Sequence, residues 1–315
     1  MRIALMTESF LPKIDGIVTM LTKTVECLRQ RGDEVLIFAP SGGPNELFGA
    51  EVVGMPSVPF PLYPELRLAP PRASMRTKLK AFDPEILHLF EPALLGVGGL
   101  YYGRVLKVPV VVSYHTNLPA YLRYYKLGAI EELTWRLMVE RHRRANLNLC
   151  TSTAMINDLQ SHGVNDLALW ERAVDSNLFR PCARSAEMRN FLSNAKPENL
   201  LLLYVGRLSA EKDVTKLRDV LRALPEAKLA IVGDGPLRHD LERHFKGYIS
   251  LFHWISARRS ISQRLCFSGS LCASVEDGNA WLGAAGSHGF RMSSNRLSCW
   301  WGSRCRTRWP YRLSV

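Results

Sequence analysis

The sequence predicts an α/β protein built from two Rossmann-like domains that face a cleft, the second of them incomplete. Short apolar runs alternate with segments of helical periodicity up to about residue 245, and a glycine follows several of these runs. The alternation stops near residue 247. We therefore expect a first domain over residues 1–170, a linker over 171–184, a partial second domain over 185–246, and a tail over 247–315 without a native fold.

Composition places the chain among globular proteins, because its 315 residues are 47% hydrophobic. No apolar run approaches the roughly 20 residues that cross a bilayer, and the first residues lead directly into an apolar strand pattern. We therefore expect a cytoplasmic location. The seven cysteines include no Cys-x-x-Cys pair, so neither a zinc site nor a disulfide framework is expected.

The net charge of +12 would by itself favour a nucleic-acid or membrane partner. However, residues 247–315 hold nine arginines and two acids, so the charge is concentrated in the tail. We expect no specific nucleic-acid partner for the folded part. The alternative is an interaction protein whose tail binds nucleic acid, and such binding would fall steeply with salt.

In the first domain, we expect polar chemistry at the carboxyl ends of strands, where open α/β sheets bind ligands. Asp15 and Gly16 lie at the first strand-helix junction, where glycine lets a backbone approach a phosphate. His115 follows the apolar strand 108–112. The alternatives are a simple helix start at Gly16 and a surface histidine at 115. The proline-rich stretch 56–71 is expected to be a long loop.

The second domain is organised around an apolar strand over 200–205, followed by Gly206 and two cations. Arg207 and Lys212, with a helix expected to begin at Lys212, could together hold one diphosphate. The alternative is a pair of solvated cations. After the strand 228–232, the turn containing Asp234 and Gly235 brings flexible backbone to the same rim.

A helix over 130–144 mixes apolar side chains with Arg141, Arg143 and Arg144. Together with the tyrosine-rich segment 121–125, it could contact an anionic membrane surface. The alternative is a helix that faces the core and exposes a solvated basic side.

Taken together, several collinear segments resemble the GT-B retaining glycosyltransferases of family 4, and among them the sulfoquinovosyltransferases. The resemblance covers residues 1 to about 245. Its segments are Thr7–Gly16, Pro61–Leu66, Ser113–Asn117, Leu149–Ala154, Asp175 with Phe179–Pro181, Glu187–Arg189, Tyr204–Lys212 and Val232–Pro236.

The resemblance implies transfer of a hexosyl group, most closely from UDP-sulfoquinovose to diacylglycerol, without a metal or another cofactor. It assigns Arg207 and Lys212 to the donor diphosphate with the Gly16 loop, and His115 to the active site. Asp15, Asp234 and Gly235 would also line the cleft. The alternative is another lipid glycosyltransferase of this family, with UDP-glucose or GDP-mannose as its donor. A lipid acceptor implies a peripheral protein on the cytoplasmic face of the inner or thylakoid membrane.

The chain departs from the family pattern in two places. Ala173 precedes Val174 and Asp175 where the family has glycine, and only Glu276 follows Glu242, so a Glu-x₇-Glu element is impossible there. Serine, arginine, tryptophan and cysteine rise together after residue 247. We therefore expect the tail to result from a shift of reading frame, and the activity of this chain to be impaired.

Overall fold

The computed structural model describes residues 1–13, 15–60, 63–125, 127–170, 182, 184–247, 249–253, 271–276, 279–284 and 289–291. For the last four of these ranges, only the backbone is described. Two compact units divide the chain, with the described residues up to 170 in the first and those from 182 onward in the second. The expected linker falls largely on residues outside the described part.

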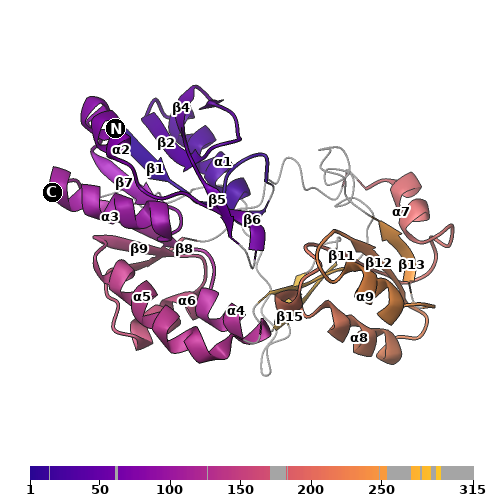
Figure 1. Ribbon diagram of the computed structural model, residues 1–315. Coiled ribbons are helices and arrows are strands. Elements are labelled where there is room, and N and C mark those ends of the chain that lie inside the picture. Colours follow the sequence, from indigo (N-terminus) through magenta and orange to yellow (C-terminus); the bar gives the residue numbers. More distant parts are fainter. Residues whose placement is uncertain are drawn as a thin grey trace. The chain divides into compact units, whose positions relative to one another are not determined.

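An eight-stranded sheet with the order β10-β9-β8-β7-β1-β2-β4-β3 forms the centre of the first unit (Figure 1). All its pairs are parallel except β3 with β4. The strands are β1 (Arg2–Met6), β2 (Glu34–Pro40), β3 (Glu46–Leu47), β4 (Ala50–Met55), β7 (Ile86–Leu89), β8 (Val110–Tyr114), β9 (Leu147–Cys150) and β10 (Leu167–Leu169). The helices are α1 (Gly16–Gln30), α2 (Ala73–Phe82), α3 (Leu94–Leu106), α4 (Leu118–Tyr124), the 3-10 turn η1 (Gly128–Ile130), α5 (Glu131–Arg143) and α6 (Thr153–Ser161).

Successive side chains of a strand point to opposite faces of a sheet. In this sheet both sets of side chains are apolar, so both faces are apolar. Ile3 and Leu5 of β1 pack in the cluster that contains Leu21, Val25 and Leu28 of α1. The alternate residues Ala4 and Met6 pack in a second cluster, with residues of α2 and α3. Burying each large side chain contributes about 1.5–3 kcal/mol, so the two helical layers hold the sheet from both sides.

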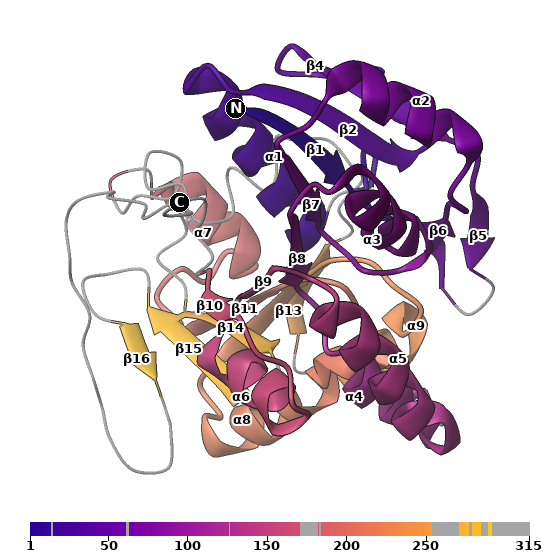
Figure 2. The same ribbon diagram turned by 90° about the vertical axis from the view of Figure 1, so that its left-hand side faces the viewer.

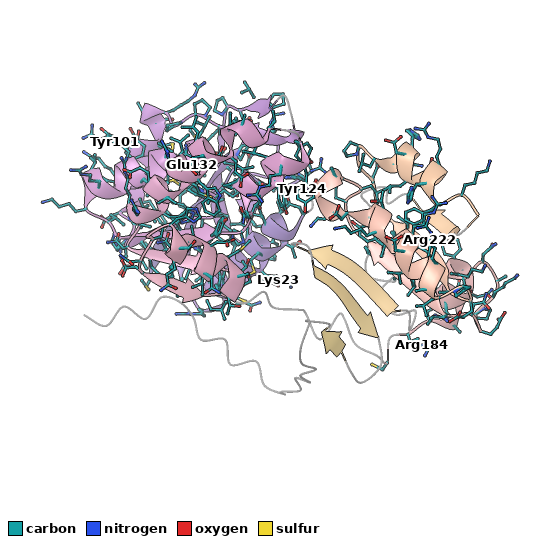
Figure 3. All side chains as sticks on the ribbon, turned by 90° about the horizontal axis from the view of Figure 1, so that it is seen from below. Lys23, Tyr101, Tyr124, Glu132, Arg184 and Arg222 are labelled. Atoms are coloured by element: carbon teal, nitrogen blue, oxygen red, sulfur yellow. The ribbon has the colours of Figure 1, made fainter. Side chains whose placement is uncertain are left out.

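Glycines allow α3 to lie directly on the sheet. A Cβ at Gly99 would collide with the side chains of Leu89 and Met6, and one at Gly103 with Val110. Figure 2 shows α3 beside α2, and Figure 3 shows Tyr101 of α3 at the outside of this unit. Four glycines thus lie on the buried side of α3, beside the buried side chains of Leu95, Leu100 and Tyr102.

The prediction of a long loop over residues 56–71 is wrong. The structure has an antiparallel hairpin of β5 (Val58–Phe60) and β6 (Tyr63–Leu68) there. Prolines are tolerated at such strands because an isolated two-stranded hairpin consists of edges. The sequence patterns also missed α2 and α4, which are short and largely exposed.

The second unit contains a six-stranded sheet in the order β13-β12-β11-β14-β15-β16. Its strands are β11 (Leu201–Val205), β12 (Lys228–Val232), β13 (Ile249–His253), β14 (Leu271–Glu276), β15 (Asn279–Ala284) and β16 (Gly289–Arg291). The helical segments are α7 (Ala186–Leu192), η3 (Ala210–Lys212), η4 (Val214–Lys216), α8 (Leu217–Ala223) and α9 (Arg238–His244). Leu202, Tyr204 and Ile231 face α8 and α9, and Leu203 and Val232 face α7.

Two expectations for this unit differ from the structure. Regular strands were expected to end before residue 247, whereas the backbone of β13 pairs with β12, and β14 pairs with β11. The helix expected to begin at Lys212 begins at Leu217, because two 3-10 turns precede α8. The reading-frame interpretation concerns side chains outside the described part and stays a prediction.

Candidate functional site

The loop after β1 carries Glu8, which bridges three segments of the first unit. Its side chain is only 2% exposed. One carboxylate oxygen accepts a hydrogen bond from the amide of Leu95, and the other accepts one from the amide of Ala69 at 3.1 Å. The N-cap residue of α3, Ala93, provides no side-chain cap. Glu8 therefore supplies the acceptor that the first turn of α3 requires.

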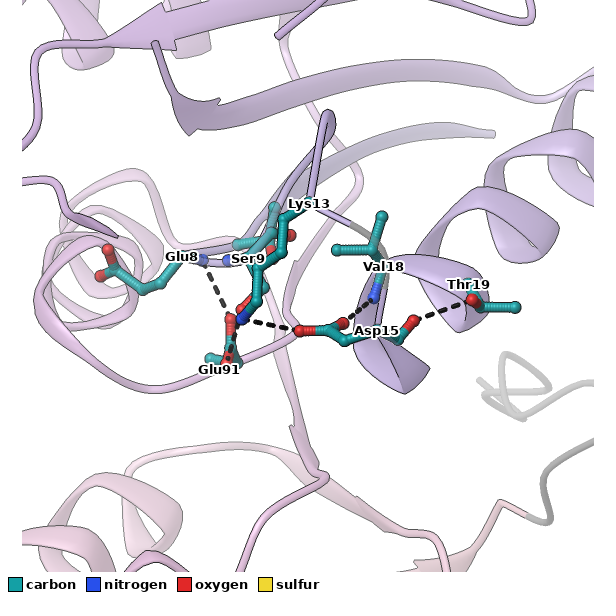
Figure 4. Close-up of polar contacts among 8 residues, drawn as sticks. Glu8, Ser9, Lys13, Asp15, Val18, Thr19 and Glu91 are labelled. Carbon is teal, nitrogen blue, oxygen red and sulfur yellow. Dashed lines mark hydrogen bonds and ion pairs between the residues drawn. The ribbon is translucent and has the colours of Figure 1, made fainter. Parts of the chain in front are cut away.

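Glu91, just after β7, holds the same loop from the other side (Figure 4). Its carboxylate accepts hydrogen bonds from the amide of Glu8 at 3.2 Å and from Ser9 Oγ at 3.3 Å. The pKa of Glu91 is raised to about 7, chiefly by burial and also by the charges of Asp15 and Glu8, while Lys13 and the hydrogen bond from Ser9 act in the opposite direction. Burial likewise raises the pKa of Glu8 to about 7. Two carboxyl groups with raised pKa values thus lie together, one in the loop after β1 and the other just after β7.

Asp15 is the N-cap of α1, and Gly16 is the first residue of that helix. Asp15 Oδ1 accepts a hydrogen bond from the amide of Val18 at 2.8 Å, and Oδ2 lies 2.7 Å from Lys13 Nζ (Figure 4). Gly16 itself is exposed. The structure confirms the strand-loop-helix junction, and it gives Asp15 a capping role that uses one of the free amides at the helix N-terminus.

His115 follows β8 directly, at the carboxyl rim of the sheet as expected. The imidazole is 6% exposed and stacks on Phe90, with 5.5 Å between ring centroids and 12° between planes. Trp170 meets the imidazole edge to face, with 6.0 Å between the ring centroids. Behind these rings, His88 Nε2 lies 2.6 Å from Ser113 Oγ, and burial lowers the pKa of His88 to about 3. His115 therefore sits in an aromatic setting that fixes its ring plane.

In the second unit, the loops after β11 and β12 are joined through their backbones. The amide of Gly206 donates to the carbonyl of Val232 at 3.0 Å, and the amide of Leu208 donates to the carbonyl of Asp234 at 2.9 Å. A Cβ at Gly233 would collide with the carbonyl oxygen of Gly206. Only glycine allows the two loops to approach so closely.

This double loop brings three of the expected site residues together. The hydroxyl of Tyr204 donates to the carbonyl of Arg207 at 2.7 Å. Gly235 has a φ of 156°, and a Cβ there would collide with the carbonyl of Leu208, beside Arg207. Asp234 Oδ1 accepts from the amide of Gly235 at 2.8 Å. Arg207, Asp234 and Gly235 thus share one rigid backbone framework.

Lys212 ends the 3-10 turn η3, five residues after Arg207. Its amide donates to the carbonyl of Ser209 at 3.1 Å, and Ser209 is fully buried. The turn therefore fixes the backbone of Lys212, although no α-helix N-terminus begins there. The expected contribution of an α-helix dipole at Lys212 is wrong, because α8 begins at Leu217.

The three arginines of α5 are engaged within the first unit. Arg141 Nη1 donates to the carbonyl of Pro92 at 2.9 Å, and Arg143 donates to the carbonyls of His162 and Gly163. Arg144 pairs with Glu140 at 2.7 Å. Because all three arginines have partners within the protein, these interactions favour the alternative of a helix that faces the core over that of a membrane contact.

Sequence patterns missed Glu8, Glu91 and His88 as site residues. An acidic residue after an apolar run gives no sign in the sequence that it is buried. Hydrogen bonds between segments more than 80 residues apart in the chain show the burial of Glu8 and Glu91. Among the described residues, no group of three or more His, Cys, Asp or Glu is placed to hold a metal. Within that same part of the chain, no helix has the length and apolar character needed to cross a bilayer.

Comparison with known proteins identifies the family. A family model described as Glycosyltransferase Family 4 matches residues 14–178, just over half of the chain. The chain belongs to Glycosyltransferase Family 4. This match covers most of the first unit, including the loop with Asp15 and Gly16 and the rim with His115.

Two relatives support this family assignment. The chain is 38% identical over 259 residues to the sulfoquinovosyl transferase SQD2 of Arabidopsis thaliana, a match that covers 80% of this chain and 50% of that protein. It is 28% identical over 265 residues to the alpha-monoglucosyldiacylglycerol synthase of Streptococcus pneumoniae, covering 77% of this chain and 58% of that one. The chain therefore spans only half or a little more of the length of these family members.

A solved structure supports the fold. The HepE protein of Anabaena, in complex with UDP and glucose, superposes with a TM-score of 0.64, covering 87% of this chain and 74% of that one. The sequence identity is 17%, so this likeness concerns the fold alone. The predicted GT-B fold class is confirmed.

Proposed function

We propose that this Family 4 protein takes part in moving a hexosyl group from a nucleotide-sugar donor to a lipid acceptor. The observation that carries the proposal is the double loop of the second unit, whose glycine contacts fix the backbone around Arg207. Five residues later, η3 fixes the backbone of Lys212. Two cations on a rigid backbone suit a diphosphate group.

The chemistry of sugar transfer requires such cations. When the bond between the sugar and the phosphate breaks, negative charge builds up on the departing diphosphate, and fixed cations stabilise that charge more in the transition state than in the ground state. We assign this role to Arg207 and Lys212. We assign His115, held by Phe90 and Trp170, to the reacting sugar, and Asp15, Gly16, Asp234 and Gly235 to the lining of the donor site. The family resemblance favours retention of configuration at the transferred carbon.

The names of the relatives favour particular substrates. The similarity to a sulfoquinovosyl transferase favours UDP-sulfoquinovose as donor, and the similarity to a glucosyldiacylglycerol synthase favours diacylglycerol as acceptor. UDP-glucose and GDP-mannose are the alternative donors. Because diacylglycerol resides in a bilayer, we propose that the protein is peripheral and acts at the cytoplasmic face of a membrane.

Nucleotide binding tests the donor assignment. Titration calorimetry with UDP, UDP-glucose and GDP-mannose should detect binding to this chain with its tail restored, and Arg207→Gln or Lys212→Gln should weaken that binding by about 2–4 kcal/mol through the lost charge interactions. Arg222→Gln is the matched control, since this exposed arginine of α8 lies in the same unit and pairs with Asp219 at 3.0 Å. Equal affinities in all three variants would remove the diphosphate assignment.

A further inference from the structure

The outer side of α3 carries an exposed apolar stripe. Leu94, Val97, Tyr101 and Val105 are spaced so that they fall on one side of the helix, and they are 40%, 38%, 62% and 42% exposed. Figure 3 shows the side chain of Tyr101 at the outside of the first unit. Four neighbouring large apolar side chains left in water mark an interaction surface.

Basic side chains accompany this stripe without acidic neighbours on the two helices. The segments 72–82 and 94–107 contain no aspartate or glutamate. In the described part of the chain, the exposed side chains of Arg76, Lys80 and Arg104 form no hydrogen bond or ion pair with the protein. By contrast, Lys78 of α2 pairs with Glu51 of β4 at 2.6 Å. Helix geometry places Arg76 and Lys80 on the side of α2 away from Lys78, and hence away from β4.

The helices that carry the stripe and the basic row are neighbours on one face of the sheet. Both helices pack into the same buried cluster on one face of the sheet. A Cβ at Gly98 of α3 would meet the side chain of Pro71, which leads into α2. The hydroxyl of Tyr102 donates to the carbonyl of Arg72 at 3.1 Å. We call Arg76, Lys80, Leu94, Val97, Tyr101 and Val105 the α2–α3 surface.

A second apolar area on α5 differs in its charge. Leu133 and Leu137 are exposed there, at 57% and 49%. The adjacent Arg136 pairs with Glu132 at 3.1 Å and Arg144 pairs with Glu140, so their charges are compensated within the helix. An anionic bilayer attracts uncompensated cations and accepts apolar side chains below its headgroups. The α2–α3 surface meets both requirements and the α5 area meets only one.

We propose that the α2–α3 surface docks this protein onto an anionic lipid bilayer. The apolar stripe enters the region between headgroups and acyl chains, while Arg76 and Lys80 contact lipid phosphates. The inference rests on the proposed function, since a lipid acceptor must be reached in a membrane. It replaces α5 and its three arginines as the membrane contact.

Vesicle sedimentation tests the proposal on the purified chain. Vesicles of phosphatidylcholine with an equal amount of phosphatidylglycerol should bind the protein, and vesicles of phosphatidylcholine alone should bind it far more weakly. Since each basic residue near an anionic surface contributes about 1 kcal/mol, Arg76→Gln with Lys80→Gln should weaken binding roughly thirtyfold. Tyr101→Ser with Val105→Ser should also weaken it, because the stripe then buries less apolar area.

Matched variants on α5 provide the control. Arg136→Gln with Arg144→Gln removes the same charge, and Leu133→Ser with Leu137→Ser removes comparable apolar area, yet both should retain binding within about threefold, since each α2 charge alone is worth more. Loss of binding in the α5 pairs but not in the α2 and α3 pairs would overturn the proposal. So would binding that ignores phosphatidylglycerol, or a dimer that Tyr101→Ser dissociates. Nucleotide binding, measured separately, distinguishes these failures from a failure of the proposed function.

Discussion

Replacing Glu91 by glutamine should change how the stability of the first unit depends on pH. The pKa of Glu91 is raised from 4.5 to about 7 in the folded protein, chiefly by burial. Between these two pH values the folded state binds more protons than the unfolded state, so stability is highest below about pH 4.5 and falls as the pH rises to about 7. A shift of this size corresponds to roughly 3 kcal/mol, at about 1.4 kcal/mol for each pKa unit.

Glu91→Gln removes this loss because glutamine does not ionise. The amide oxygen of glutamine can still accept a hydrogen bond from the amide of Glu8 or from Ser9 Oγ, so the loop keeps one of its contacts. Relative to the wild type, the variant should therefore gain roughly 3 kcal/mol between pH 4.5 and pH 8. The pKa of Glu8 is raised in the same direction, so the variant keeps the part of the pH dependence that comes from Glu8.

Hydrogen exchange of the β1 and β7 amides is a suitable assay, since it reports opening of the first unit independently of the second. Glu140→Gln is the control, because Glu140 is an exposed carboxylate of α5. Its exchange should follow the wild type at every pH. Parallel curves for the wild type and Glu91→Gln from pH 4.5 to pH 8 would refute the reasoning, because they would show that Glu91 ionises without cost in the folded state.

Three further predictions concern the two loops, the histidine and the tail. Gly233→Ala should destabilise the second unit by about 3 kcal/mol or more, measured by urea unfolding, because the backbone carbonyl of Gly206 cannot easily move away; an unchanged midpoint would contradict the close approach of the loops. In a full-length family member, replacing the residue equivalent to His115 by alanine should reduce turnover more than donor affinity; an effect on stability alone would favour a purely structural histidine. Sequencing the coding DNA around codon 247 should show that a one-base correction restores a Glu-x₇-Glu element; closed alternative frames would show that the tail is genuine.

Local sequence patterns were sufficient for the parts of the fold that depend on near neighbours. The apolar run before Gly206 predicted β11, and the run over 228–232 is β12 to the residue. The position of His115 at the end of β8 also followed from the pattern, because an apolar run leading into polar residues marks the carboxyl end of a buried strand. These features arise from the period of the side chains and the conformational freedom of glycine, which the sequence contains directly.

Tertiary structure alone decided which charged residues are special. Glu8 and Glu91 are 83 residues apart, and their pKa values are raised because two distant segments bury them, so that desolvation outweighs their hydrogen bonds. Arg141 and Arg143 looked available to a membrane, yet they bind carbonyls of the loop after Glu91 and of the end of α6. Conversely, the exposure of Tyr101 emerged only once glycines had set the other side of α3 against the sheet. Burial and charge compensation depend on which distant segments come together, and a linear pattern contains no record of that.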